Sequence, residues 1–202
     1  MNNEIENVLL IFIKNPQKGN VKTRLAQTVG DEKALEVYHK LLKRTREITS
    51  GLRCDRQVWY SSFIEHDDIW SSENFEKRLQ KGKDLGERMS HAFERAFIDG
   101  YKKVVIIGSD CADINGQFIE QAFHKLENSD VVVGPAQDGG YYLLGMREFH
   151  PDLFAGIDWS TSSVFQQTVK RIKEKQRSIE LLPILNDIDT EDDLATSDLN
   201  ID

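Results

Sequence analysis

The sequence predicts an α/β fold of three layers, with a mostly parallel sheet between two layers of helices. Short apolar segments alternate with amphipathic segments along nearly the whole chain, which is the pattern of helix-covered parallel sheets. The first apolar segment, Val8 to Ile13, has no polar interruption, as expected of a strand buried on both faces. We expect one domain over residues 1–202, because this length suits one substantial core.

The first half of the chain predicts two helices and two further strands. Residues 31–49 place apolar side chains three and four positions apart, which predicts an amphipathic helix. Residues 56–63 are aromatic and β-branched and predict a strand, whereas residues 65–76 are polar and predict a surface excursion. The segment from Gly82 introduces a second helix, and residues 104–107 predict the next strand.

In the second half, a helix is predicted from about residue 115 or 116 to 126, and two strands, 131–133 and 141–146, flank a glycine-rich loop. The serines and the threonine at 160–163 are cap candidates for a helix that reaches about residue 175, and a strand over 180–185 follows. Finally, Thr190 and Asp193 have the spacing of a capping box at the start of a short helix.

The composition excludes several classes of protein. With 39% hydrophobic and 30% charged residues, the chain resembles ordinary globular proteins. A net charge of −8 argues against nonspecific nucleic-acid binding, which depends on many basic contacts. No apolar run has the length of a membrane helix, and residues 1–4 do not begin a secretory signal, so we expect a cytoplasmic protein without a membrane partner. Cys54 and Cys111 lack metal-site spacing and are expected to be reduced thiols.

Four cations surround a glycine directly after the first strand. Lys14, Lys18, Lys22 and Arg24 flank Gly19 in a chain that is acidic overall. In open α/β sheets, ligands bind at the carboxyl ends of the strands, and a loop with fixed cations and exposed N–H groups suits a diphosphate. The alternative is a solvated, lysine-rich turn. The position after the first strand favours phosphate binding.

Carboxylates follow two other strands. Asp110 comes directly after the buried strand at 104–107, and Asp187 and Asp189 follow the last strand. Magnesium or manganese takes oxygen ligands, often one or two carboxylates completed by substrate phosphates and water. We therefore expect Asp110 to bind a metal, although aspartates in such places also cap helices. For Asp113 the helix cap is the favoured interpretation.

A further carboxylate lies in the glycine-rich loop between residues 133 and 141. Asp138 stands before Gly139, Gly140 and Tyr141, and could accept protons from hydroxyl groups of a substrate. An ordinary Asp-Gly turn is the alternative. Gly139, Gly140 and Tyr141 are candidates for an acceptor pocket. Trp159 is a further candidate for it, with burial in the core as the alternative.

Six segments together resemble one bacterial family: FIKNPQKGNVKTRLA, GKDLGERM, GSDCADI, DVVVGPAQDGGYYLLGM, IDWSTSSV and DIDTEDDL. They resemble the radical-SAM/selenodomain-associated transferase 1 family, whose fold is similar to the nucleotide-diphospho-sugar transferases of GT-A type. The resemblance implies a nucleotide ligand with Mg²⁺ or Mn²⁺ and leaves the acceptor open. Relatives with the same fold include guanylyltransferases.

The resemblance also assigns roles to individual residues. It implies that Lys14, Lys22 and Arg24 contact phosphates and that Asp110 and Asp189 bind the metal. The segment from Gly82 to Arg88 is similar to the stretch that borders the nucleotide, which makes Arg88 a candidate nucleotide ligand. Ala112 stands where the family tends to have proline, and the loss of that rigid turn affects the placement of Asp113 most.

Three functions are consistent with these observations. Glycosyl transfer from a nucleotide sugar to a small-molecule acceptor is the first. Nucleotidyl transfer from a nucleoside triphosphate, with release of pyrophosphate, is the second. A nonenzymatic nucleotide-binding protein that has kept the fold is the third, because fold does not imply activity.

Overall fold

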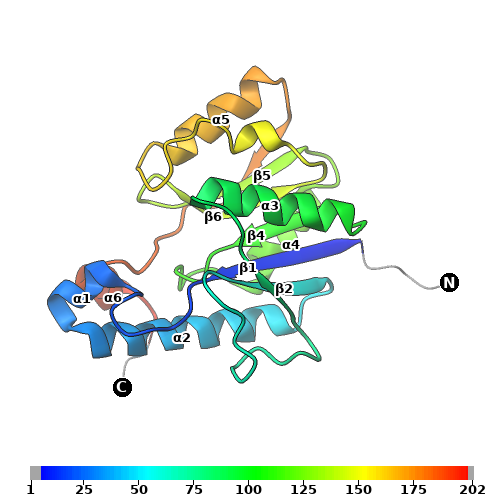
Figure 1. Ribbon diagram of the computed structural model, residues 1–202. Coiled ribbons are helices and arrows are strands. Elements are labelled where there is room, and N and C mark those ends of the chain that lie inside the picture. The colour runs from blue at the N-terminus through cyan, green and yellow to red at the C-terminus, as the bar shows by residue number, and fades with distance from the viewer. Residues whose placement is uncertain (1–5, 200–202) are drawn as a thin grey trace.

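A computed structural model describes residues 6–199 and contains a seven-stranded sheet with helices on both faces (Figure 1). The strands are β1 (Asn7–Ile13), β2 (Asp55–Tyr60), β3 (Glu76–Leu79), β4 (Lys103–Ile107), β5 (Val131–Pro135), β6 (Tyr141–Met146) and β7 (Ile179–Leu181). The helices are α1 (Thr23–Val29), α2 (Asp31–Ser50), α3 (Leu85–Ile98), α4 (Gly116–Lys125), a 3₁₀ turn η1 (Pro151–Leu153), α5 (Val164–Glu174) and α6 (Glu191–Thr196).

The sheet has the strand order β3-β2-β1-β4-β6-β5-β7. Among the described strands, β6 runs antiparallel to both its neighbours and the other four pairings are parallel. The predicted mostly parallel sheet is therefore confirmed.

Two apolar cores separate the sheet from its helical layers. The side chains of Leu9 and Ile11 belong to the core under α2 and α4, whereas Val8 and Leu10 belong to the core under α3 and α5. Side chains of a strand alternate between faces, so a strand between two helical layers must be apolar at every position. This explains the continuous apolar run of β1 and confirms the three-layer prediction.

The central strands end together at one edge of the sheet. Ile11 of β1 lies opposite Ile107 of β4, and Phe12 lies opposite Trp59 of β2. In Figure 1, β1 runs from right to left, and α1 and α6 lie beyond its carboxyl end. Because these strands are parallel, the segments that follow them share this edge.

Several local predictions were wrong. Residues Thr23–Val29 form α1, although the sequence predicted a loop there. The excursion after β2 packs Trp70 and Phe75 into the core and ends in β3, a strand that the sequence analysis did not identify. The side chain of Asn115 caps α4, so Asp113 is not the cap.

The last strand is shorter than predicted, since it ends at Leu181 instead of residue 185. By contrast, the capping box at Thr190 and Asp193 is present, and Cys54 and Cys111 are free and buried as expected. No helix within residues 6–199 combines the length and the apolar character needed to cross a membrane. The prediction of one domain covers residues 1–202, and the expectation about a secretory signal concerns residues 1–4. Both include residues outside the described range.

Gly134 in β5 offers a test of the core beneath the site. The ring of Tyr142 lies so close that a Cβ at position 134 would be 2.4 Å from its Cζ. We expect Gly134→Ala to lower the free energy of unfolding by about 1 to 3 kcal/mol, because the ring must move. Gly51→Ala is the control, since its Cβ would meet nothing within 4 Å. Equal urea midpoints for the two variants would contradict this packing.

Candidate functional site

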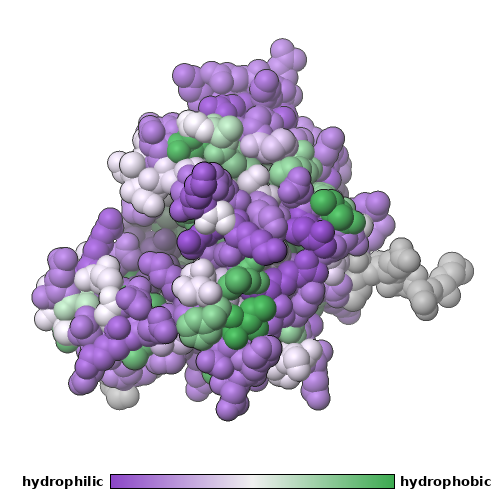
Figure 2. Space-filling model, in the orientation of Figure 1, coloured by the Kyte–Doolittle hydropathy of each residue, from purple (hydrophilic) through white to green (hydrophobic). Residues whose placement is uncertain are grey.

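A cleft of about 1020 Å³ opens at the carboxyl edge of the sheet. Its walls come from the β1–α1 loop, the β3–α3 loop, the residues after β4, the β5–β6 loop with the start of β6, and the segments around Trp159 and Asp187. Figure 2 shows a recess on the left of the molecule, within a largely hydrophilic face. This volume suits a ligand of the size of a nucleotide conjugate.

Tyr38 of α2 fixes the backbone where β1 and β4 end. The Lys14 N–H donates to the Tyr38 hydroxyl at 2.8 Å, and that hydroxyl also contacts the Lys14 carbonyl at 3.1 Å and Ser109 Oγ at 3.2 Å. Burial raises the pKa of Tyr38 far above its usual range, so the hydroxyl stays protonated. The loop carrying Lys14 and the residue before Asp110 are thus held together.

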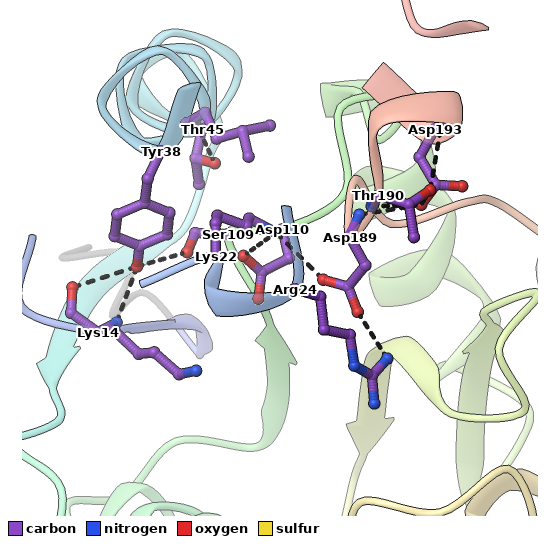
Figure 3. A network of polar contacts seen from close by, with 11 residues as sticks. Lys14, Lys22, Arg24, Tyr38, Thr45, Ser109, Asp110, Asp189, Thr190 and Asp193 are labelled. Atoms are coloured by element: carbon purple, nitrogen blue, oxygen red, sulfur yellow. Dashed lines mark hydrogen bonds and ion pairs between the residues drawn. The ribbon is translucent and has the colours of Figure 1, made fainter. Parts of the chain in front are cut away.

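The Lys22 ammonium lies among carboxylates (Figure 3). Its Nζ is 2.6 Å from Asp110 Oδ1 and 3.6 Å from Asp189 Oδ1, and the side chain is only 3% exposed. Asp189 Oδ2 also contacts the Arg24 guanidinium at 3.3 Å. The predicted phosphate ligands Lys22 and Arg24 are therefore paired with the predicted metal ligands.

Backbone contacts bring Asp187 and Asp189 beside Asp110. The Ile188 N–H donates to the Asp110 carbonyl at 3.0 Å, and Asp187 forms an isolated bridge with Cys111. The capping box then fixes the next turn, because Asp193 Oδ2 accepts from the N–H groups of Asp189 and Thr190. Two chain segments far apart in sequence thereby form one acidic cluster.

Asp187 is the most perturbed carboxyl of this cluster. Burial and the nearby Asp110 carboxylate raise the pKa of Asp187 to about 7. Its Oδ1 is buried and accepts no hydrogen bond within the described residues. Negative charge is therefore in excess at this point, although Lys22 opposes the shift.

Asp138 and Trp159 form another part of the cleft. Asp138 is exposed and lines the cleft, while its Oδ1 accepts from the Gly140 N–H at 2.8 Å, so it also makes the turn that its sequence suggested. Trp159 is half-buried against α3, where Gly86 leaves room for its ring. A Cβ at Gly86 would lie 2.0 Å from Trp159 Nε1.

Most of the predicted site residues line this cleft. Those that do are Lys14, Lys22, Arg24, Arg88, Asp110, Asp138, Gly140, Tyr141, Trp159 and Asp189. Gly19 and Gly139 do not. Gly139 instead packs against the backbone of Ser162, since a Cβ there would lie 2.0 Å from the Ser162 oxygen.

The sequence analysis missed Lys83, Tyr38 and Ser109. The loop that carries Lys83 and leads into α3 is held in place by Gln80, whose amide donates to the carbonyls of Ile13 and Trp59 at the ends of β1 and β2. Lys83 follows Gly82 in the segment GKDLGERM, and its place in that segment could have identified it as a candidate site residue. No local pattern distinguishes Tyr38 from other core residues.

Oxygen ligands for a hard cation are present in the cleft. Asp110 and Asp189 would hold Mg²⁺ or Mn²⁺, which commonly take one or two carboxylates together with substrate phosphates. Within the described chain, no three or more His, Cys, Asp or Glu side chains form a set ready to hold a metal. The donor set therefore fits a metal that shares its ligands with a bound phosphate.

Residues 44–161 match the family model of DUF2064, described as "Uncharacterized protein conserved in bacteria". The chain belongs to DUF2064. No match to this DUF2064 protein was found among curated proteins. The sequence analysis predicted the radical-SAM/selenodomain-associated transferase 1 family, whereas the family that the comparison shows is DUF2064.

A solved structure from Desulfovibrio desulfuricans G20, provisionally named a nucleotide-diphospho-sugar transferase, is 38% identical to the DUF2064 protein. The match covers 95% of this chain and 85% of that chain, with a TM-score of 0.89. The protein thus has the fold of nucleotide-diphospho-sugar transferases, which confirms the predicted GT-A type.

More distant structures share the fold alone. The 4-diphosphocytidyl-2C-methyl-D-erythritol synthase of Anaerococcus prevotii DSM 20548 is 8% identical, over 94% of this chain and 92% of that chain, with a TM-score of 0.57. Rv0371c of Mycobacterium tuberculosis H37Rv, in a complex with manganese, is 12% identical over 94% and 95% of the two chains, with a TM-score of 0.53.

The Tyr38 hydroxyl provides a test of this site geometry. We expect Tyr38→Phe to lower the free energy of unfolding by about 1 to 3 kcal/mol, because the Lys14 N–H and Ser109 lose a buried partner. Tyr141→Phe is the matched control, since the buried Tyr141 hydroxyl has no hydrogen-bond partner within the described residues. Chemical denaturation measures both, and a Tyr141→Phe loss as large as that of Tyr38→Phe would contradict the assignment.

Proposed function

We propose that this protein is a metal-dependent glycosyltransferase that transfers a sugar from a nucleotide-activated donor to a small-molecule acceptor. The observation that carries the proposal is the presence of cations and metal-type carboxylates in one cleft at the carboxyl edge of the sheet. The resemblance of six segments to the radical-SAM/selenodomain-associated transferases supports the same choice.

The donor diphosphate would lie along the basic side of the cleft. Within the described residues, Lys14 and Arg88 line the cleft and are in no ion pair with a carboxylate, so their charges are available to phosphate. The Arg88 Nε donates to the Gly82 carbonyl at 3.2 Å, which orients its guanidinium. Fixed cations favour departure of a nucleoside diphosphate, since they stabilise the negative charge that develops on it.

Asp110 and Asp189 would hold the divalent cation. When bound there, Mg²⁺ or Mn²⁺ would supply further positive charge to the leaving diphosphate. The manganese complex of Rv0371c concerns a protein with the same fold and motivates a trial of Mn²⁺ beside Mg²⁺.

The acceptor would enter beside Asp138 and Trp159. The exposed carboxylate of Asp138 has one oxygen engaged by the Gly140 N–H, which orients the group. Its other oxygen could accept a proton from an acceptor hydroxyl as that hydroxyl attacks the sugar. Gly140, Tyr141 and Trp159 would form the surrounding pocket.

The test is turnover of a panel of nucleotide sugars and nucleoside triphosphates, with Mg²⁺, with Mn²⁺ and with a chelator. Candidate hydroxyl acceptors are supplied, and products are separated by chromatography. We expect metal-dependent release of a nucleoside diphosphate from one nucleotide sugar. Pyrophosphate release from a triphosphate would replace this proposal with nucleotidyl transfer, and binding without turnover of any donor would favour a nonenzymatic role.

Asp110→Asn tests the site directly. We expect turnover to fall by about 10²-fold or more, because the substitution removes a carboxylate from the proposed metal site. Asp113→Asn is the matched control, since it makes the same charge change three positions away at an exposed residue outside the cleft lining. Equal turnover in the two variants would remove Asp110 from the mechanism.

A further inference from the structure

A buried ammonium stands where the proposed metal ligands meet. Lys22 Nζ contacts Asp110 Oδ1 at 2.6 Å and approaches Asp189 Oδ1 to 3.6 Å (Figure 3). The Lys22 side chain is 3% exposed, whereas the carboxylate side chains of Asp110 and Asp189 are 44% and 40% exposed. The two acids are therefore open to the cleft on one side and neutralised by Lys22 on the other.

The chain holds Lys22 in this place through an uncommon backbone conformation. Lys22 precedes the first residue of α1 and has a φ of 48°, in the left-handed region that side chains other than those of Gly, Asn and Asp rarely adopt. Its side chain makes no cap for α1 and turns instead to the carboxylates. Such conformations persist where the surrounding structure fixes them.

The cluster around Lys22 has more acidic than basic groups. Three carboxyl groups lie there, those of Asp110, Asp187 and Asp189, because backbone contacts join the Asp187–Asp189 segment to Asp110 and Cys111. The cations that contact them are Lys22 and Arg24. Moreover, Asp187 Oδ1 is buried without a hydrogen-bond partner in the described chain. Oxygen ligands thus remain for a cation, but Lys22 is already paired with one oxygen of Asp110 and one of Asp189.

We propose that Lys22 takes the place of the divalent cation in the nucleotide-free protein and moves to the phosphates when metal and nucleotide bind together. This inference rests on the proposed function in assigning a diphosphate ligand to the cleft. A bound diphosphate offers the ammonium a second anionic partner within the same cleft. Asp110 and Asp189 then become free to bind the metal.

Cooperative binding follows from this exchange. A metal that arrives alone must displace an ammonium from Asp110 with no new partner for it, so it binds weakly. A diphosphate that arrives alone leaves the carboxylates unneutralised as it draws Lys22 away. Each ligand removes the obstacle to the other, and linkage requires the two effects to be equal.

The first experiment measures Mn²⁺ binding to the nucleotide-free protein by the electron paramagnetic resonance signal of free Mn²⁺. We expect Lys22→Met to bind Mn²⁺ about tenfold or more tightly than the wild type, because the competing ammonium is gone. Lys18→Met is the control for net charge, since Lys18 belongs to the same loop but pairs with Glu32 at the surface. Its Mn²⁺ affinity should equal that of the wild type.

Mn²⁺ binding by Lys22→Met that is no tighter than wild type would overturn the inference. No nucleotide enters this measurement, so it can fail while the transferase assay succeeds, and the reverse also holds. The two proposals are therefore tested separately.

A second experiment uses the wild-type protein, in case Lys22→Met does not fold. The ammonium signal of Lys22 is observed by ¹⁵N NMR of ¹⁵N-labelled lysine side chains and assigned by its loss in Lys22→Arg. We expect Mg²⁺ alone to leave the signal nearly unchanged and Mg²⁺ with inorganic pyrophosphate to shift it. A signal unchanged by saturating Mg²⁺ and pyrophosphate together, or shifted fully by Mg²⁺ alone, would contradict the exchange.

Discussion

The parallel pairing of β1 with β4 is the constraint on which the site depends. Both strands are buried on two faces, and their register brings Ile11 opposite Ile107 at the same edge of the sheet. The residues that follow must then share one space, which places the basic loop after β1 beside Asp110. Tyr38 fixes this arrangement, because one hydroxyl contacts both Lys14 and Ser109. The juxtaposition of the two oppositely charged loops is a consequence of strand pairing.

The sequence predicted features that depend on neighbouring positions along the chain. The apolar run of β1 required burial on both faces, and the spacing of Thr190 and Asp193 required a capping box, which is present. Asp110 was predicted at the sheet edge because it follows a buried strand, and it lines the cleft there. In each case the physical cause is local, so a single sequence contains it.

Other features depend on contacts between segments far apart in the sequence, so local sequence patterns could not predict them. Lys22 contacts both Asp110 and Asp189 across large separations in sequence, and no spacing rule connects these residues. The polar composition of residues 65–76 predicted a surface segment, yet Trp70 and Phe75 belong to the core. Tertiary packing of two aromatic rings thus outweighed the polarity of the residues around them. The prediction that Asp113 caps α4 was wrong for a local reason. Asn115 is an equally good capping residue and stands directly before the helix.

Charge balance unites the site geometry with the proposed function. Free cations and clustered carboxylates in one cleft are the basis for the proposal that a phosphate and a metal bind there together. The 38% identical relative, provisionally named a nucleotide-diphospho-sugar transferase, shares this fold. Lys22 is the residue that would couple the binding of the metal to the binding of the diphosphate.

The most direct measurement is a crystal structure of the protein with Mn²⁺ and the nucleoside diphosphate that gives the largest metal-dependent thermal shift. An anomalous difference map locates the manganese without ambiguity. We expect a peak bound to Asp110 and Asp189, with phosphate oxygens on the metal and the Lys22 ammonium on phosphate instead of on Asp110. A nucleotide bound outside this cleft, or manganese bound away from both aspartates, would contradict it.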